Sequence, residues 1–124
     1  MKTILIIEKY PFYRAEICRL LRLENYQVLQ AENGIEGLKL AREKHPDLIL
    51  CDVEIPGLDG YKVLENLRAD TTVPKIPFVF LAGSIDVDSH SRAMKLGASA
   101  YLSKLASPSE LLRVIATKLA STVS

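Results

Sequence analysis

Strand-length apolar runs alternate with segments of helical periodicity along the whole chain, and this order constrains the fold more than any other feature. The runs Thr3 to Ile7 and Leu48 to Cys51 are continuously apolar, as is typical of strands that are buried on both faces. Three shorter runs also predict strands, namely Val28–Leu29, Phe78–Leu81 and Ala100–Leu102. Because a helical segment follows each strand, we predict an α/β fold of the flavodoxin-like type, with a doubly wound five-stranded parallel sheet.

Proline, glycine and capping residues mark the ends of the predicted helices. Pro11 fits the first turn of the first helix, and Ser107 begins the last one. The fourth helix is predicted from about Asp86 to Leu96 and ends at Gly97, a residue that favours the left-handed conformation after a helix. The residues predicted to face the core from the second, third and fifth helices are Ile35, Leu38, Ala41, Val63, Leu64, Leu67, Leu111, Leu112, Ile115 and Leu119.

Length and charge limit the classes of protein that fit this chain. With 124 residues it is long enough for one domain and too short for two, so residues 1–124 are predicted to form a single domain. That domain is either a stand-alone regulator or part of a longer protein. Sixteen basic and fifteen acidic residues leave a net charge of +1, which gives no reason to expect direct binding to nucleic acid or membrane. No apolar stretch is long enough to span a bilayer. The two cysteines, Cys18 and Cys51, are predicted to be free thiols of a cytoplasmic protein.

Charged residues lie just after the ends of three of the predicted strands. In a doubly wound sheet, ligands bind beyond the carboxyl ends of the strands, so these positions form the candidate site. Glu8 follows the first strand, Asp52 the third and Lys104 the fifth. A carboxylate beside a fixed lysine can accept a phosphoryl group, because phosphoryl transfer depends mainly on positioning and charge neutralisation. The chain has neither a GxGxxG motif nor a P-loop, so an independent enzyme is not expected.

Three segments of the chain together resemble the receiver domains of response regulators, the CheY-like family. Residues 46–60 (PDLILCDVEIPGLDG) resemble the phosphoacceptor segment, residues 76–81 (IPFVFL) the fourth strand, and residues 97–104 (GASAYLSK) the fifth strand with its lysine. The resemblance covers essentially the whole chain in the family's order. It implies a receiver domain of two-component (phosphorelay) signal transduction, which accepts phosphate from a histidine kinase or a phosphotransfer protein.

The resemblance implies roles for five residues. Asp52 corresponds to the aspartate that is phosphorylated, and Lys104 to the lysine that pairs with it and with the incoming phosphoryl group. Tyr101 corresponds to the aromatic residue that moves between exposed and buried positions on activation, although a tyrosine at the end of a short strand also occurs as half-buried packing. Glu8, Asp52 and the backbone carbonyl of Glu54 correspond to the ligands of Mg²⁺, the cofactor that the family implies.

Three positions depart from the family pattern. Lys9 stands in place of a second acid. Directed inward, it would pair with Asp52 and weaken metal binding; directed outward, it would leave the ligands free. Ala82 replaces a Thr or Ser whose hydroxyl binds the phosphoryl group, which removes a hydrogen bond worth about 1.5–3 kcal/mol, and Ser84 is the nearest hydroxyl that could substitute. Leu105 replaces a proline that is commonly preceded by a cis bond, so we expect either a trans bond with a shifted loop or retained strain.

Two functions remain open from the sequence. In the first, phosphorylation changes the affinity of a downstream output domain or protein for the face formed by the fourth helix, the fifth strand and the fifth helix. In the second, the chain is a pseudo-receiver, an interaction module that keeps the fold and signals without phosphorylation. The first function is favoured by the retained residues Asp52, Lys104, Tyr101 and Glu8. The second is favoured by Lys9, Ala82 and Leu105. A homodimer formed through the same face is a further alternative that the family implies.

Overall fold

The computed structural model describes residues 1–121, which contain strands and helices in the predicted alternating order. The elements are β1 (Thr3–Ile7), α1 (Pro11–Leu23), β2 (Gln27–Ala31), α2 (Gly34–Lys44), β3 (Leu48–Asp52), α3 (Gly60–Ala69), β4 (Phe78–Ala82), α4 (Val87–Lys95), β5 (Ala100–Ser103) and α5 (Pro108–Ala120). The strands form one parallel sheet in the order β2-β1-β3-β4-β5. The predicted flavodoxin-like α/β fold is confirmed.

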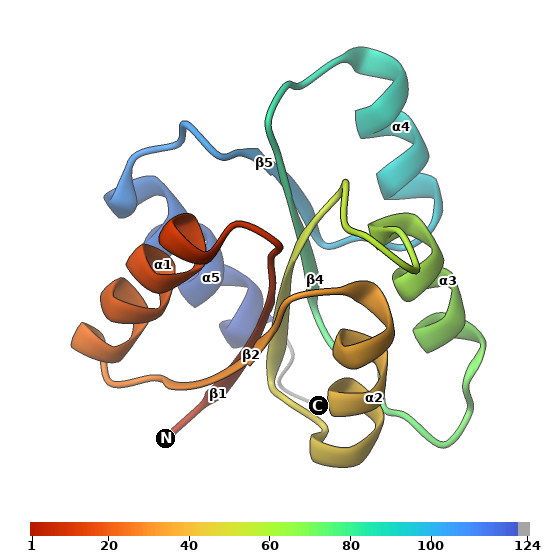
Figure 1. Ribbon diagram of the computed structural model, residues 1–124, viewed down its shortest axis with the longest axis horizontal. Coiled ribbons are helices and arrows are strands. Elements are labelled where there is room, and N and C mark those ends of the chain that lie inside the picture. The colour runs from red at the N-terminus through yellow and green to blue at the C-terminus, as the bar shows by residue number, and fades with distance from the viewer. Residues whose placement is uncertain (122–124) are drawn as a thin grey trace.

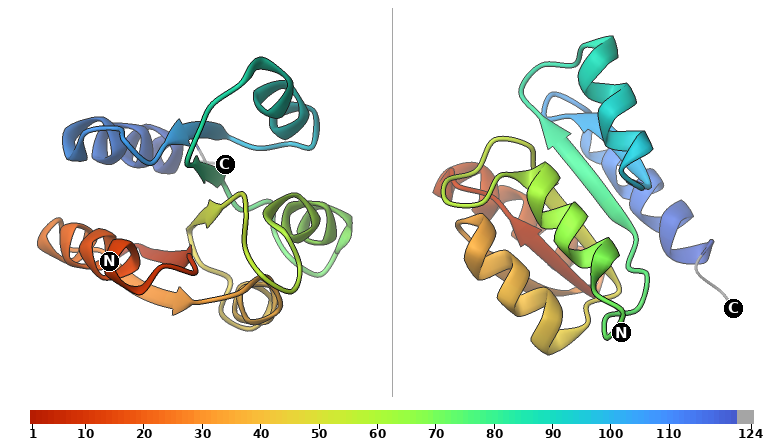
Figure 2. Two further views of the ribbon diagram at one scale, coloured as in Figure 1. Left: turned by 45° about the horizontal axis from the view of Figure 1, so that its top comes forward. Right: turned by 90° about the vertical axis from the view of Figure 1, so that its right-hand side faces the viewer.

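The helices cover both faces of the sheet, with α1 and α5 on one side and α2, α3 and α4 on the other (Figures 1 and 2). Each face has its own apolar core. Ile4 and Ile6 of β1 pack in the core under α1 and α5. Leu5 and Ile7 pack in the core under the other three helices. Successive side chains of a strand point to opposite faces, which explains why neighbouring residues belong to different cores.

The position of each strand in the sheet explains its composition. β1, β3 and β4 are central strands, and every residue of β3 and β4 is buried. β2 is an edge strand, and its residues Gln27 and Gln30 are exposed. The continuous apolar run of β2 is therefore only Val28–Leu29. The strand itself is longer than this run at both ends, because it pairs with the whole of β1.

One predicted core position is wrong. Ile35 is 65% exposed, whereas the predicted Leu38 and Ala41 are buried together with Gly34 and Gly37. A Cβ atom on Gly37 would lie 2.4 Å from Ile7 Cδ1, so the helix approaches the sheet through this glycine. That approach turns Ile35 to the surface. The other predicted core residues of these helices are buried, except that Leu112 packs against the core while partly exposed.

Capping residues fix the starts of four helices. The side chains of Asn33, Asp59, Asp86 and Ser107 each accept a hydrogen bond from the backbone N–H three residues later. Gly97 follows α4 with a φ of +98°, in agreement with its predicted role. Within residues 1–121, no helix has both the length and the apolar character that crossing a membrane requires.

Candidate functional site

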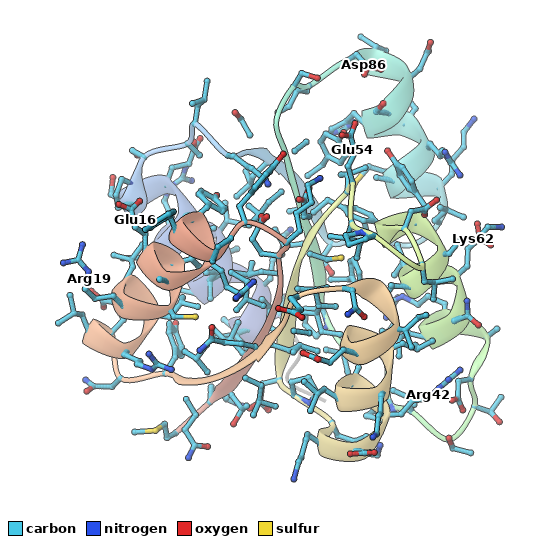
Figure 3. All side chains as sticks on the ribbon, in the orientation of Figure 1. Glu16, Arg19, Arg42, Glu54, Lys62 and Asp86 are labelled. Carbon is cyan, nitrogen blue, oxygen red and sulfur yellow. The ribbon has the colours of Figure 1, made fainter. Side chains whose placement is uncertain are left out.

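The predicted site residues Glu8, Asp52 and Lys104 meet at the edge of the sheet where its strands end. A cavity of about 610 Å³ opens over Asp52 at this edge. Glu54 lies at the same edge, in the loop after β3, whereas Arg42 lies at the opposite end of the molecule (Figure 3). The lining of the cavity includes Lys9, Tyr13, Ala82, Ser84, Tyr101 and Lys104. The parallel topology therefore brings the predicted residues together.

Asp52 is the last residue of β3 and is only 3% exposed. Its Oδ1 atom accepts a hydrogen bond of 3.1 Å from the backbone N–H of Glu54. Its Oδ2 atom accepts a hydrogen bond of 3.0 Å from Lys104 Nζ and lies 3.7 Å from Lys9 Nζ. One backbone donor and two ammonium groups thus hold the carboxylate.

Glu8 and Asp52 are the only buried charged residues among those that the structure describes, and Glu8 has no exposed surface. Its Oε2 atom accepts a hydrogen bond of 3.0 Å from the backbone N–H of Tyr10, and its Oε1 atom lies 2.7 Å from Lys104 Nζ. Lys104 therefore bridges Glu8 and Asp52. Burial disfavours the charged ammonium, but the hydrogen bonds and charges of the two acids outweigh this effect and raise the pKa of Lys104.

Lys9 points into the site. Its side chain is 27% exposed, and its Nζ atom donates a hydrogen bond to the backbone carbonyl of Glu54 and forms an ion pair with Asp52. These are two of the three groups predicted to bind Mg²⁺, and the third, Glu8, is paired with Lys104. Within residues 1–121, no group of three or more His, Cys, Asp or Glu side chains is arranged to hold a metal ion. The geometry does not fit a divalent ion while Lys9 keeps these contacts.

Of the two further departures from the family pattern, Ala82 lines the cavity over Asp52, whereas Leu105 is 89% exposed. Ala82 ends β4 and lines the cavity, so a methyl group stands where the resemblance implies a hydroxyl. Ser84 lines the same cavity, and its role as a substitute stays a prediction. The bond between Lys104 and Leu105 is trans, as in the first of the two predicted alternatives, and the shift of the loop stays a prediction. Lys104 still points to Asp52, and its backbone N–H donates to the carbonyl of Ala82 at 2.8 Å.

Comparison with known proteins identifies the family. The family model of the response regulator receiver domain matches residues 4–116. The chain is a response regulator receiver domain. Protein PilH from Pseudomonas aeruginosa is 32% identical to it over 120 residues, which cover 97% of this chain and 99% of PilH. The receiver domain therefore belongs to two-component signal transduction.

Longer proteins also contain similar receiver domains. The phosphate regulon transcriptional regulatory protein PhoB from Pseudomonas aeruginosa is 32% identical over 111 residues, which cover 90% of this chain and 48% of PhoB. The receiver domain of a sensor histidine kinase from the same organism was solved with a magnesium ion coordinated in its active-site cleft. It is 27% identical to the present receiver domain, with a TM-score of 0.88 and coverage of 96% of this chain and 98% of that chain.

Tyr101 of the receiver domain is directed inward. It is 7% exposed, and its ring centroid lies 6.1 Å from that of Phe80 and 5.7 Å from that of His90 in α4. Burial and the neighbouring Tyr61 raise the pKa of Tyr101 to about 12. The resemblance implies an exposed and a buried position for this ring, and the Tyr101 ring occupies the buried position.

Sequence reasoning missed two aromatic residues of the receiver site. The ring centroids of Tyr10 and Tyr13 lie 5.0 Å and 5.1 Å from Lys104 Nζ, and Lys9 Nζ is also 5.0 Å from the Tyr10 centroid. Burial and the charge of Glu8 raise the pKa of Tyr13 to about 12. The positions of Tyr10 and Tyr13 in the sequence could have predicted their place in the site. The residues between β1 and the first turn of α1 lie at the carboxyl edge of the sheet.

Proposed function

We propose that this receiver domain accepts a phosphoryl group on Asp52 from a histidine kinase or a phosphotransfer protein. The observation that supports the proposal is the 3.0 Å contact between Asp52 Oδ2 and Lys104 Nζ beside an open cavity of about 610 Å³. A carboxylate oxygen forms a bond to phosphorus while the bond from phosphorus to the donor's histidine nitrogen breaks, and the electron pair stays on that nitrogen. Lys104 neutralises part of the negative charge that the phosphoryl group brings.

We infer that phosphorylation is transmitted to the face formed by α4, β5 and α5. Tyr101 of β5 lines the cavity over Asp52 and contacts His90 of α4, so it connects the acceptor to this face. A downstream output domain or protein would bind the face in one of its two states, and a homodimer through the same face is the alternative partner. We further infer a cytoplasmic location and no independent catalytic activity.

Intact-mass spectrometry after incubation with acetyl phosphate tests the acceptor. We expect one phosphoryl adduct on the wild-type protein and none on Asp52→Asn, because an amide oxygen is a poor nucleophile. Asp59→Asn is a matched control, since Asp59 is an exposed acid at the same edge and Asn is an equally good helix cap. Absence of an adduct on the wild-type protein, both with acetyl phosphate and with a phosphorylated histidine donor, would contradict the proposal.

The second candidate function is that of a pseudo-receiver, which signals by binding alone. Ala82 favours it, because a methyl group cannot form a hydrogen bond of about 1.5–3 kcal/mol to a phosphoryl oxygen. That loss is as large as a typical allosteric coupling of about 1–3 kcal/mol. Two-dimensional amide NMR with beryllofluoride, a mimic of the aspartyl phosphate, separates the two functions. Shifts that spread from Asp52 to Tyr101 support the phosphorylated switch, and the absence of shifts supports the pseudo-receiver.

A further inference from the structure

Lys9 makes the contacts that a bound cation would make in this site. Its Nζ atom donates to the backbone carbonyl of Glu54, which lies at the carboxyl edge of the sheet (Figure 3), and it lies 3.7 Å from Asp52 Oδ2. A carbonyl oxygen and a carboxylate oxygen are the kinds of ligand that Mg²⁺ prefers. The Lys9 ammonium therefore engages two oxygen atoms that a divalent ion would need.

The remaining acid of the site is engaged as well. Glu8 has no exposed surface, and its two carboxylate oxygens contact the Tyr10 N–H at 3.0 Å and Lys104 Nζ at 2.7 Å. Lys104 also holds Asp52 at 3.0 Å. A metal ion that used either oxygen of Glu8 would therefore have to share it with the Lys104 ammonium or the Tyr10 N–H, or displace that donor.

The formal charges of the cluster already cancel. Glu8 and Asp52 contribute two negative charges, and Lys9 and Lys104 contribute two positive charges. Tyr10 helps two ammonium groups to lie near one carboxylate, because both Nζ atoms are 5.0 Å from its ring centroid. A divalent ion would add two positive charges to a site that is balanced without it.

We propose that the Lys9 ammonium is a resident cation of this site and takes the place of a divalent metal ion. A related receiver domain has magnesium coordinated in its active-site cleft, so the fold itself does not prevent metal binding. Lys9 acts here as a positioning residue, since it fixes the Asp52 carboxylate and, through Glu54, the loop that follows β3. If Asp52 is the acceptor, which is the function proposed above, its phosphorylation does not require Mg²⁺.

Metal binding by the wild-type protein and by Lys9→Asp tests this proposal. The probe is Mg²⁺, and its binding is measured by isothermal titration calorimetry and by the change in melting temperature. The broadening of amide NMR signals by Mn²⁺ locates the bound ion. We expect no saturable binding by the wild-type protein at millimolar Mg²⁺. We expect Lys9→Asp to bind at least about tenfold more tightly, because the variant exchanges a cation for an oxygen ligand.

Two further variants make the result specific. Lys39→Asp changes the net charge by the same amount on the exposed surface of α2, where the Lys39 side chain is 73% exposed, and should bind Mg²⁺ no better than the wild-type protein. Lys9→Gln removes the charge without adding an acid, so it serves if Lys9→Asp does not fold, and it should also bind more tightly than the wild-type protein. Wild-type binding as tight as that of the Lys9 variants would overturn the proposal.

Phosphorylation by acetyl phosphate with EDTA or with Mg²⁺ separates this inference from the proposed function. Equal adduct formation on the wild-type protein under both conditions supports both. An adduct that forms only with Mg²⁺ overturns the resident cation and leaves Asp52 as the acceptor. No adduct under either condition or with a phosphorylated histidine donor, together with metal binding confined to the Lys9 variants, overturns the proposed function and leaves the resident cation.

Discussion

Lys104 lies closer to Glu8 than to Asp52, its Nζ atom being 2.7 Å from Glu8 Oε1 and 3.0 Å from Asp52 Oδ2. Glu8 is fully buried, so the ion pair offsets the cost of removing a carboxylate from water. The lysine to which the resemblance assigns phosphoryl binding thus also stabilises the unphosphorylated fold.

Lys104→Met should lower the free energy of unfolding by about 3–5 kcal/mol, because it leaves a buried carboxylate without its partner. Urea denaturation followed by circular dichroism measures the change. The double variant Glu8→Gln with Lys104→Met should be less destabilised than Lys104→Met alone, since an amide carries no charge.

Lys62→Met is the matched control for this experiment. Lys62 pairs with Glu65 at 3.5 Å, but both side chains are exposed, so the free energy of unfolding should change by no more than about 1 kcal/mol. Equal effects of Lys62→Met and Lys104→Met would show that the buried pair contributes no more than a surface pair.

Ala82→Thr should strengthen beryllofluoride binding about tenfold to a hundredfold, because it restores a hydrogen bond of about 1.5–3 kcal/mol to the charged ligand. Fluorine NMR titration measures the affinity. Ala82→Val has nearly the same shape without the hydroxyl, so any steric effect of the larger side chain appears in both variants. The same affinity for Ala82→Thr and Ala82→Val would rule out a role for the missing hydroxyl.

Tyr101 and Tyr13 should ionise late in an alkaline titration, because burial raises the pKa of each to about 12. The folded state holds these protons more tightly than the unfolded state, whose tyrosines ionise near pH 10. Their contribution to stability is therefore fully present below about pH 10 and is lost as the pH rises from about 10 to about 12.

Tyrosinate absorbance as a function of pH measures this ionisation. Tyr101→Phe should remove one late-ionising group and leave that of Tyr13. An unchanged absorbance curve in Tyr101→Phe would mean that Tyr101 does not ionise in this range.

Gly34→Ala should lower the free energy of unfolding by about 1–3 kcal/mol, because a Cβ atom at this position would lie 1.8 Å from the carbonyl oxygen of Leu58. The clash is with backbone, so the loop after β3 must move. Gly83→Ala is the control, since no atom lies within 4 Å of a Cβ atom there, and its melting temperature should not fall. Similar melting temperatures for the two variants would contradict the close packing of α2 on this loop.

The order of strands and helices is predictable from the sequence because it depends on local pattern. Continuous apolar runs identify β1, β3 and β4, and Gly97 marks the end of α4. The place of the site is predictable as well, since parallel strands end at one edge and Glu8, Asp52 and Lys104 each follow or end a strand.

The resemblance implied the pairing of Lys104 with Asp52, and an inward Lys9 was one of two alternatives, but the other contacts inside the site could not be predicted because they join residues far apart in the chain. Lys9 and Glu54 are 45 positions apart, and no local pattern shows whether a lysine at the end of a strand turns inward. The pairing of Lys104 with Glu8 depends likewise on the order of the strands in the sheet, and the outward position of Ile35 depends on how α2 packs against β1. Sequence periodicity thus accounts for the fold, and the resemblance of three segments accounts for the family. The balance of charges around Asp52 follows only from the packed sheet, because the sheet brings together residues that are far apart along the chain.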